Sequence, residues 1–223
     1  MTNTIFDHEN SVIEKILIRH PTLIHAHEKL EECYNVACYS DEPINLIIAG
    51  EPRSGKSTIL KTFVSKYPRH REPTEMRVPV LAIECPAKPT VISLTEVLLE
   101  KIGDSVYSSG TTGRRIARLK KLIKRTKVKM IVIDEFQHLI DKGTLKVAYE
   151  TADWLKGIVN ECNVSLVVAG LPGAITVFER NEQFMGRFNA PICLPVYDWR
   201  KKKDRQEFKS IMASFNNAIV KRY

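Results

Sequence analysis

The fold is decided by one stretch, INLIIAGEPRSGKS at residues 44–57. It begins with the apolar run Ile44–Ala49, which has the length of a buried β-strand and ends at Gly50. A loop follows, and we expect a helix from Lys56 to about Ser65. The stretch therefore predicts a strand, a tight loop and a helix in immediate succession.

The loop matches the pattern G-x-x-x-x-G-K-[ST] in full, in the strand–loop–helix context that this pattern requires. Its glycines let backbone N–H groups converge on phosphate oxygens, and the helix directs its positive dipole end at the same anion. We expect Lys56 to reach the β- and γ-phosphates of ATP, and Ser57 to bind Mg²⁺. The alternative is a chance match in an unrelated loop. The predicted nucleotide-binding residues of this segment are Gly50, Glu51, Pro52, Arg53, Ser54, Gly55, Lys56, Ser57 and Thr58.

A second apolar run, Met130–Ile133, ends in the carboxylates Asp134 and Glu135. An acid at a strand end beside a phosphate loop is a Mg²⁺ ligand, so Asp134 is predicted to bind the metal together with Ser57 and to belong to the nucleotide site. Glu135 is placed to orient or deprotonate the attacking water, which makes it the predicted catalytic residue. The alternative is that Glu135 only caps the next helix.

Apolar strands alternate with helices along most of the chain. Further strands are expected at 78–84, 165–169 and 192–196, and further helices at 94–102, 114–125, 147–160 and 175–180. Continuous apolar strands of this kind form a parallel sheet that is covered on both faces. The prediction is a three-layer α/β fold with a central parallel five-stranded sheet, whose ligands bind at the carboxyl ends of the strands.

The composition of the 223 residues, 43% hydrophobic and 27% charged, is that of an ordinary globular protein. No apolar run approaches the roughly 20 residues that span a bilayer, and the first ten residues do not look like a signal peptide, so no membrane partner is expected. Five scattered cysteines without a CxxC pair suggest neither a zinc site nor a disulfide framework and fit the cytoplasm. The net charge of +8 favours a polyanion such as nucleic acid, although it can also serve solubility alone.

These residues resemble the TniB/TnsC family of AAA+ transposition ATPases, with MuB and ExeA-like ATPases as more distant relatives. The resemblance extends from Arg19 to Trp199. The stretches that carry it are the lead-in around His20-Pro21, GEPRSGKST at 50–58, VLAIECPAKPT at 80–90, IVIDEFQHL at 131–139, VVAGLPGA at 167–174 and RNEQFMGRF at 180–188.

The resemblance implies a P-loop NTPase fold of the AAA+ type in three parts. Residues 1–43 are expected to form a helical lead-in that is interrupted at His20-Pro21. Residues 44–200 are the expected ATPase core. Residues 201–223 are expected to begin a helical lid that is truncated, and Asp204–Ile219 carries an apolar stripe at helical spacing.

The resemblance also implies a function. Proteins of this family form homo-oligomeric rings or filaments on duplex DNA in the presence of ATP, connect a target-selection protein to the transposase, and disassemble on hydrolysis. Arg187 is similar to the arginine that acts on a neighbouring subunit's nucleotide, with Arg180 as second candidate; surface salt bridges are the alternative for both. The strand end Gly170-Leu171-Pro172 offers no polar side chain where many AAA+ proteins have a sensor.

The family's DNA contacts come largely from the helical region before the acidic strand. In this sequence, basic residues recur there at helical spacing after a loop of small residues, which favours phosphate contacts with little sequence preference. A solvated basic helix face is the alternative. The predicted DNA-binding residues are Thr111, Thr112, Arg114, Arg115 and Lys121.

Three other functions stay open from the sequence. One is a different AAA+ machine, of the secretion or helicase-loader type. Another is a nucleotide-gated binding module that hydrolyses little ATP. A small-molecule kinase is more remote, because it needs an acceptor pocket and an arginine-rich lid.

Overall fold

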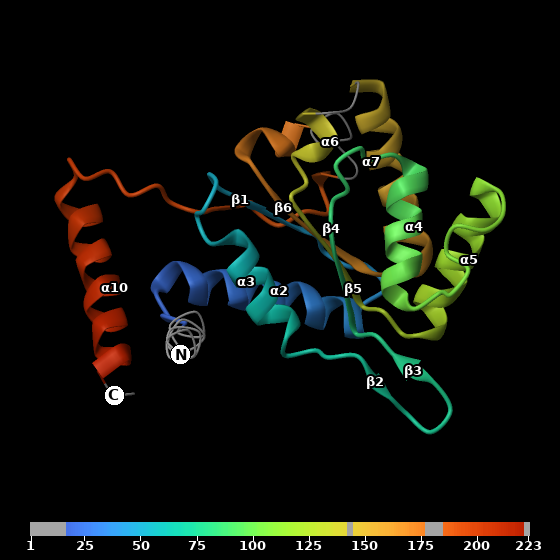
Figure 1. Ribbon diagram of the computed structural model, residues 1–223, viewed down its shortest axis with the longest axis horizontal. Helices are drawn as coiled ribbons and strands as arrows, with labels where there is room; N and C mark the ends of the chain where they lie inside the picture. Colours follow the sequence, from blue (N-terminus) through green and yellow to red (C-terminus); the bar gives the residue numbers. More distant parts are fainter. Residues whose placement is uncertain (1–16, 142–144, 177–184, 221–223) are drawn as a thin grey trace, which may run out of the picture. The chain divides into compact units, whose positions relative to one another are not determined.

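The computed structural model describes residues 17–141, 145–176 and 185–220 (Figure 1). These residues divide into two compact units. The larger unit comprises 26–195, and the smaller one combines the described parts of 1–25 and 196–223.

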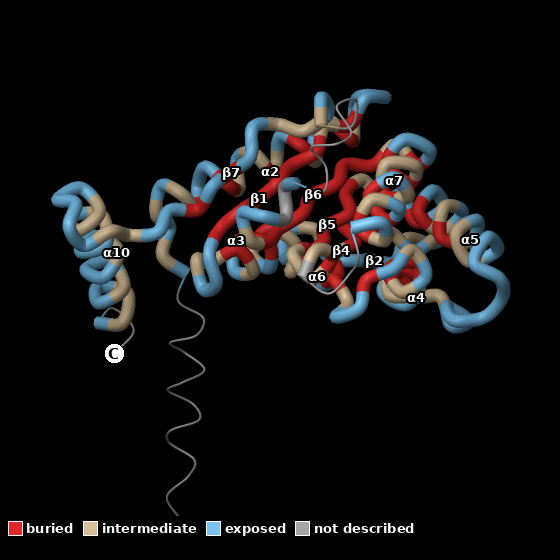
Figure 2. Tube along the Cα trace, turned by 90° about the horizontal axis from the view of Figure 1, so that it is seen from above, coloured by how far each residue is buried: buried red, intermediate tan, exposed pale blue. Residues whose placement is uncertain are grey.

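A five-stranded sheet forms the centre of the larger unit, in the order β4-β5-β6-β1-β7 with every neighbouring pair parallel. Strand β6 is buried along its whole length (Figure 2). Only Asp134 of β5 is not fully buried. The predicted parallel five-stranded sheet is confirmed. The strands are β1 (Leu46–Ala49), β4 (Val80–Glu84), β5 (Met130–Asp134), β6 (Ser165–Gly170) and β7 (Ile192–Cys193).

Helices cover both faces of this sheet, which gives the predicted three layers. On one face, Ile131 and Ile133 pack into a core that includes residues of α4, α5 and α7. Met130 and Val132 are also buried but point to the opposite face, where α3 contacts β5 and β6 and α2 packs on α3. The helices of this unit are α2 (Pro21–Tyr39, which begins in the smaller unit), α3 (Lys56–Val64), α4 (Val91–Ile102), α5 (Thr112–Arg125), α6 (His138–Asp141) and α7 (Leu145–Cys162).

Several boundaries differ from the predicted ones, and prolines explain two of them. Strand β4 begins at Val80 rather than at residue 78, because Pro79 has no N–H for the ladder and the Val78 N–H donates to Thr126 O instead. Strand β7 ends at Cys193, two residues before Pro195. Helix α4 begins at Val91 rather than at Leu94, because the Thr90 side chain forms a capping box with Ser93.

Some elements were not predicted from the sequence. A two-stranded antiparallel sheet joins β2 (His70–Arg71) to β3 (Met76–Arg77), and α6 follows β5 directly. A 3₁₀-helix, η1, spans Pro172–Ile175. The helix expected at 175–180 falls largely on residues 177–184, which lie outside the described residues.

The smaller unit contains the helix α10 (Lys202–Val220), none of whose residues is fully buried. The Phe208 ring makes edge contacts with Tyr197 and Trp199, at centroid distances of 5.8 and 6.0 Å. In the part of the chain that the structure describes, no helix combines the length and the apolar character that crossing a bilayer requires.

Candidate nucleotide-binding site

The phosphate loop turns between the end of β1 and the start of α3 through two residues with positive φ. Arg53 has φ 63° and Gly55, the N-cap of α3, has φ 97°. At Gly55 a Cβ would meet no atom within 4 Å, whereas at Gly50 it would lie 2.5 Å from Ser54 Oγ and 3.0 Å from Leu194 Cβ. The loop thus leaves open space at its helix end and is tightly packed at its strand end.

Lys56 places a buried positive charge on the inner side of this loop. Its Nζ donates hydrogen bonds to Gly50 O at 2.8 Å and to Glu51 O at 2.9 Å. These carbonyls orient the ammonium group without neutralising it, because neither carries a formal charge. Ser54 Oγ is buried too and has no hydrogen-bond partner among the described residues. The loop therefore offers a cation and an unused hydroxyl, a donor set that fits an anion.

The acidic side of the site lies at the end of β5. Asp134 Oδ1 accepts a hydrogen bond from Glu135 N at 2.9 Å, and Glu135 itself has φ 54°. The next residue, Phe136, donates its N–H to Ala169 O of β6 at 2.9 Å, which anchors this turn to the neighbouring strand. The Glu135 carboxylate accepts a hydrogen bond from Gln137 Nε2, and Gln137 Oε1 accepts one from Leu171 N at 3.3 Å.

The two sides face a common pocket of about 420 Å³ at the carboxyl edge of the sheet. Seven of the predicted nucleotide-site residues line it, and Asp134 lies one residue before its acidic wall. Gly50, Glu51 and Ser54 belong to the loop but not to the lining. The lining residues are Pro52, Arg53, Gly55, Lys56, Ser57, Thr58, Glu135, Gln137 and Leu171.

The residues fit a magnesium ion that shares its coordination with phosphates. Among the described residues, no group of three or more His, Cys, Asp and Glu side chains is arranged to hold a metal by itself. Mg²⁺ usually keeps several waters and takes only one or two protein ligands beside substrate phosphates. Ser57 lines the pocket and Asp134 directly precedes Glu135 on its wall, so one hydroxyl and one carboxylate adjoin the pocket, a donor set compatible with Mg²⁺–ATP.

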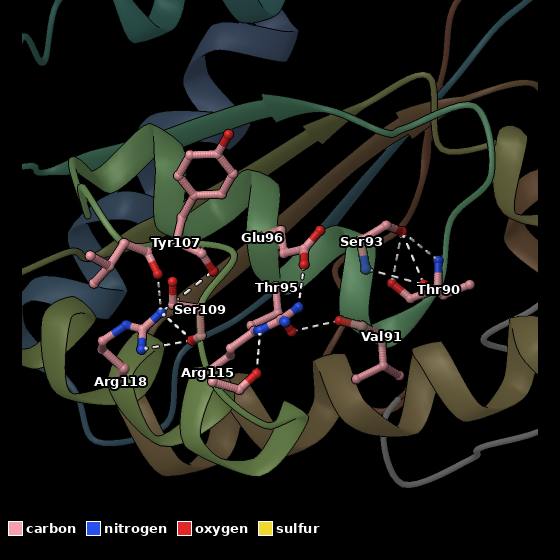
Figure 3. Close-up of polar contacts among 11 residues, drawn as sticks. Thr90, Val91, Ser93, Thr95, Glu96, Tyr107, Ser109, Arg115 and Arg118 are labelled. Atoms are coloured by element: carbon pink, nitrogen blue, oxygen red, sulfur yellow. Dashed lines mark hydrogen bonds and ion pairs between the residues drawn. The ribbon is translucent and has the colours of Figure 1, made fainter.

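The predicted DNA-binding residues lie at the start of α5, where their side chains differ in availability. Arg115 pairs with Glu96 of α4 and donates from Nε to Gly110 O at 3.0 Å (Figure 3). Thr111 is the N-cap of α5 and accepts from Arg114 N at 3.4 Å. Thr112, Arg114 and Lys121 are exposed.

Arg118, one turn after Arg114, is also bound within the chain. Its Nε donates to Asp104 Oδ2 at 2.6 Å, and its Nη2 donates to Val106 O at 2.7 Å. Nη2 also donates to Ser109 O at 3.2 Å (Figure 3). Arg115 and Arg118 therefore hold the segment between α4 and α5 in place, which leaves Arg114 and Lys121 as the exposed cations of the predicted DNA-binding set.

Arg187 lies near the amino end of β1, whereas the pocket lies near the carboxyl end of that strand. Its backbone carbonyl accepts from Asn45 N at 2.8 Å, just before β1, and its exposed side chain donates from Nη1 to Asn160 Oδ1 at 2.7 Å. The pocket lies beyond the other end of β1, so the structure does not bring Arg187 to the nucleotide site of its own chain. Arg180, the second candidate, lies outside the described residues.

Comparison with protein families matches the chain to the bacterial TniB protein over residues 10–199. The chain belongs to the TniB family. This result confirms the resemblance of the sequence to the TniB/TnsC family. The sequence has no match among curated proteins.

Solved structures similar to this TniB-family chain share its fold at low sequence identity. The ORC2 protein of Aeropyrum pernix, solved as ADPNP–ADP complexes, has a TM-score of 0.65 and 13% identity, over 93% of this chain and 55% of that chain. The ORC1 protein of Aeropyrum pernix in complex with DNA has a TM-score of 0.59 and 18% identity, over 89% and 53%. CDC6P from Pyrobaculum aerophilum has a TM-score of 0.62 and 12% identity, over 94% and 53%. The chain spans about half the length of these proteins, and the fold they share is that of the P-loop AAA+ ATPases.

Two lining residues of this TniB-family pocket were not predicted as site residues. Gln137 and Leu171 are 34 positions apart and meet only because β5 and β6 are neighbours. One feature of the sequence could have pointed to Gln137. It is a polar residue two positions after Glu135, whereas the end of the neighbouring strand, Gly170-Leu171-Pro172, has no polar side chain.

Proposed function

We propose that this chain is an ATP-hydrolysing regulator of DNA transposition that binds Mg²⁺–ATP and duplex DNA, oligomerises, and connects target selection to the transposase. One observation carries the ATPase part: a single pocket has Lys56 and Ser57 on one wall and Glu135 on the other. Membership of the TniB family supports the transposition part.

In the proposed site, the loop holds the phosphates and the end of β5 acts on water. Lys56 and the N-terminus of α3 balance the negative charge of the β- and γ-phosphates. Ser57 and Asp134 would hold Mg²⁺, which when bound neutralises charge that develops on the phosphates. Glu135 orients the attacking water and accepts its proton, while the pocket walls keep both in place.

Glu135→Gln tests the catalytic assignment. Because the amide cannot accept the proton, we expect ATP turnover to fall about 100-fold or more, while Mg²⁺–ATP binding measured by calorimetry is retained. A matched control is Glu84→Gln, which changes a carboxylate at the end of the neighbouring strand that does not line the pocket. Unchanged turnover in Glu135→Gln contradicts the assignment. Wild-type protein that binds Mg²⁺–ATP without turnover would instead be a nucleotide-gated binding module.

The DNA part of the proposal rests on the exposed cations of α5 and on the family. A similar structure, the Aeropyrum pernix ORC1 protein, was solved in complex with DNA. Here, Arg114 and Lys121 would contact phosphates without reading the sequence. The chain would act in the cytoplasm, where its DNA partner is found.

Electron microscopy of the purified protein with duplex DNA tests assembly. We expect rings or spirals on DNA with a non-hydrolysable ATP analogue, and none without nucleotide. A transposase or target-selection protein that joins these assemblies supports the transposition role over a helicase-loader or secretion role. Protein that stays monomeric under all conditions contradicts the proposed oligomer.

A further inference from the structure

We infer that Gln137 is a positioning residue that holds the Glu135 carboxylate in the pocket and is itself held by the backbone N–H of Leu171, directly after β6. This inference rests on the proposed ATP hydrolysis and deepens it. It starts from the end of β6, where Gly170, Leu171 and Pro172 place no polar side chain. The structure shows that the backbone N–H of Leu171 donates to Gln137 Oε1 and that both residues line the pocket.

The two hydrogen bonds of Gln137 fix the orientation of its amide group. Leu171 N is a donor only, so it must face Gln137 Oε1, at 3.3 Å. The ionised Glu135 carboxylate is an acceptor only, so it must face Gln137 Nε2, and these two groups are hydrogen-bonded. A glutamine satisfies both partners at once, with acceptor and donor on the same rigid plane. Reversal of the amide would break both contacts.

The arrangement links the catalytic carboxylate to a fixed element of the fold. Glu135 has φ 54°, a rare conformation for a residue with a side chain, so its own backbone is not a relaxed support. Gln137 adds a second attachment, from the Glu135 carboxylate to the backbone of Leu171, the residue directly after the buried strand β6. The Glu135 carboxylate is then fixed relative to the sheet, and the attacking water that it orients is held in the same position.

Two substitutions separate the two halves of this link. In Gln137→Glu, the side chain can still accept from Leu171 N but no longer donates to Glu135, and it brings a second carboxylate beside the first. In Gln137→Met, a side chain of similar length loses both hydrogen bonds. Hydrogen exchange at the Leu171 amide, followed by NMR without nucleotide, should stay slow in Gln137→Glu and become faster in Gln137→Met. Equal exchange in both variants contradicts the anchoring of Gln137 on β6.

Turnover tests the link to catalysis. We expect kcat to fall about 100-fold in both variants, because the carboxylate is no longer held in position, while KM and the affinity for Mg²⁺–ATP are retained. In the Glu135→Gln background, Gln137→Met should lower kcat no further, since the residue acts through Glu135. Wild-type turnover in Gln137→Glu, or equal losses in the two backgrounds, overturns the inference alone. Absence of turnover in the wild-type protein overturns the proposed hydrolysis itself.

Discussion

Gly50 is a residue at which the phosphate loop leaves no room for a side chain. A Cβ would lie 2.5 Å from Ser54 Oγ, which can rotate away, and 3.0 Å from Leu194 Cβ, which cannot. The Gly50 carbonyl also accepts one of the two hydrogen bonds from Lys56. We expect Gly50→Ala to destabilise the fold by about 1–3 kcal/mol and to weaken Mg²⁺–ATP binding, measured by thermal unfolding and calorimetry.

A glycine with free space is the matched control for this substitution. Gly113 lies in the first turn of α5, where a Cβ would meet no atom within 4 Å. Gly113→Ala should leave nucleotide binding unchanged and raise stability by about 0.5–1 kcal/mol, since alanine favours the helix. Equal effects of the two substitutions on stability and nucleotide binding would show that crowding at Gly50 is not the cause of the loss in Gly50→Ala.

At the residue scale, the sequence predicts what is local and misses what topology brings together. The phosphate-loop residues are consecutive and the two acids are adjacent, so a pattern read along the chain finds them. Gln137 acquires its place from Leu171, through the pairing of β5 with β6, and no spacing rule encodes that contact. The availability of Arg115 was equally hidden, because its partner Glu96 belongs to another helix.

The α5 helix combines two kinds of arginine at adjacent positions, and this allows a prediction at the scale of the element. Arg115 is bound to Glu96 and to Gly110 O, whereas Arg114 is exposed. Arg115→Ala should lower the free energy of unfolding by about 1–3 kcal/mol, because it leaves Glu96 without its charged partner. Arg114→Ala should leave stability unchanged but weaken duplex binding at all sequences and reduce the salt slope by about 1. Thermal unfolding and a salt titration of DNA binding measure both, and an unaltered slope removes Arg114 from the interface.

The docking of α2 on α3 predicts how stability depends on pH. Partial burial tends to raise the pKa of Glu31, but hydrogen bonds from Lys66 and Tyr67 outweigh it and leave the pKa below its ordinary value of 4.5. A carboxyl group whose pKa is lowered by folding stabilises the protein above its unfolded pKa, and this stabilisation is lost as pH falls through the folded value.

The pH dependence is tested with Glu31→Gln. At pH 7 it should cost about 1 kcal/mol, since both ionic partners are partly exposed. That cost lowers Tm by about 2–4 °C. The difference from wild type should shrink as pH falls below 4.5 and through the lowered folded pKa, because the wild-type carboxyl then becomes protonated as well. Melting curves from pH 7 down through this acidic range measure the effect, and a difference that does not change with pH would exclude the ionised form as the cause.

Elements with a strong hydrophobic signal were predicted, and short polar ones were not. The strands β1, β5 and β6 are continuous apolar runs because both faces of the sheet are covered. Their burial can therefore be predicted directly from the sequence. The hairpin β2–β3 consists of the pairs His70-Arg71 and Met76-Arg77, in which no residue is buried. Its pairing is stabilised by neighbouring side chains, such as Arg77 with Glu72, rather than by a pattern of hydrophobicity.

At the scale of the whole molecule, the proposed catalytic residues lie at opposite ends of the parallel strands. The pocket lies beyond the carboxyl end of β1, and Arg187 lies beside Asn45 at its amino end. The strand between them spans about 13 Å. The side chain of Arg187 also points to Asn160 at the end of α7. If Arg187 stabilises charge on the transferred phosphate, it must therefore do so in a neighbouring copy of the chain.

This geometry predicts complementation between two inactive variants. Arg187→Ala keeps an intact pocket and lacks the arginine, while Lys56→Ala lacks the pocket and keeps the arginine. Each alone should lose turnover by about 1000-fold. In a 1:1 mixture with random neighbours, about a quarter of the interfaces join an intact pocket to an intact arginine, so turnover should return to about a quarter of the wild-type value. Asn160→Ala, which removes only the partner of Arg187 within the chain, should retain turnover. A mixture as inactive as its components would contradict action of Arg187 on a neighbouring subunit's nucleotide, because random assembly brings intact pockets and intact arginines together wherever subunits share a site.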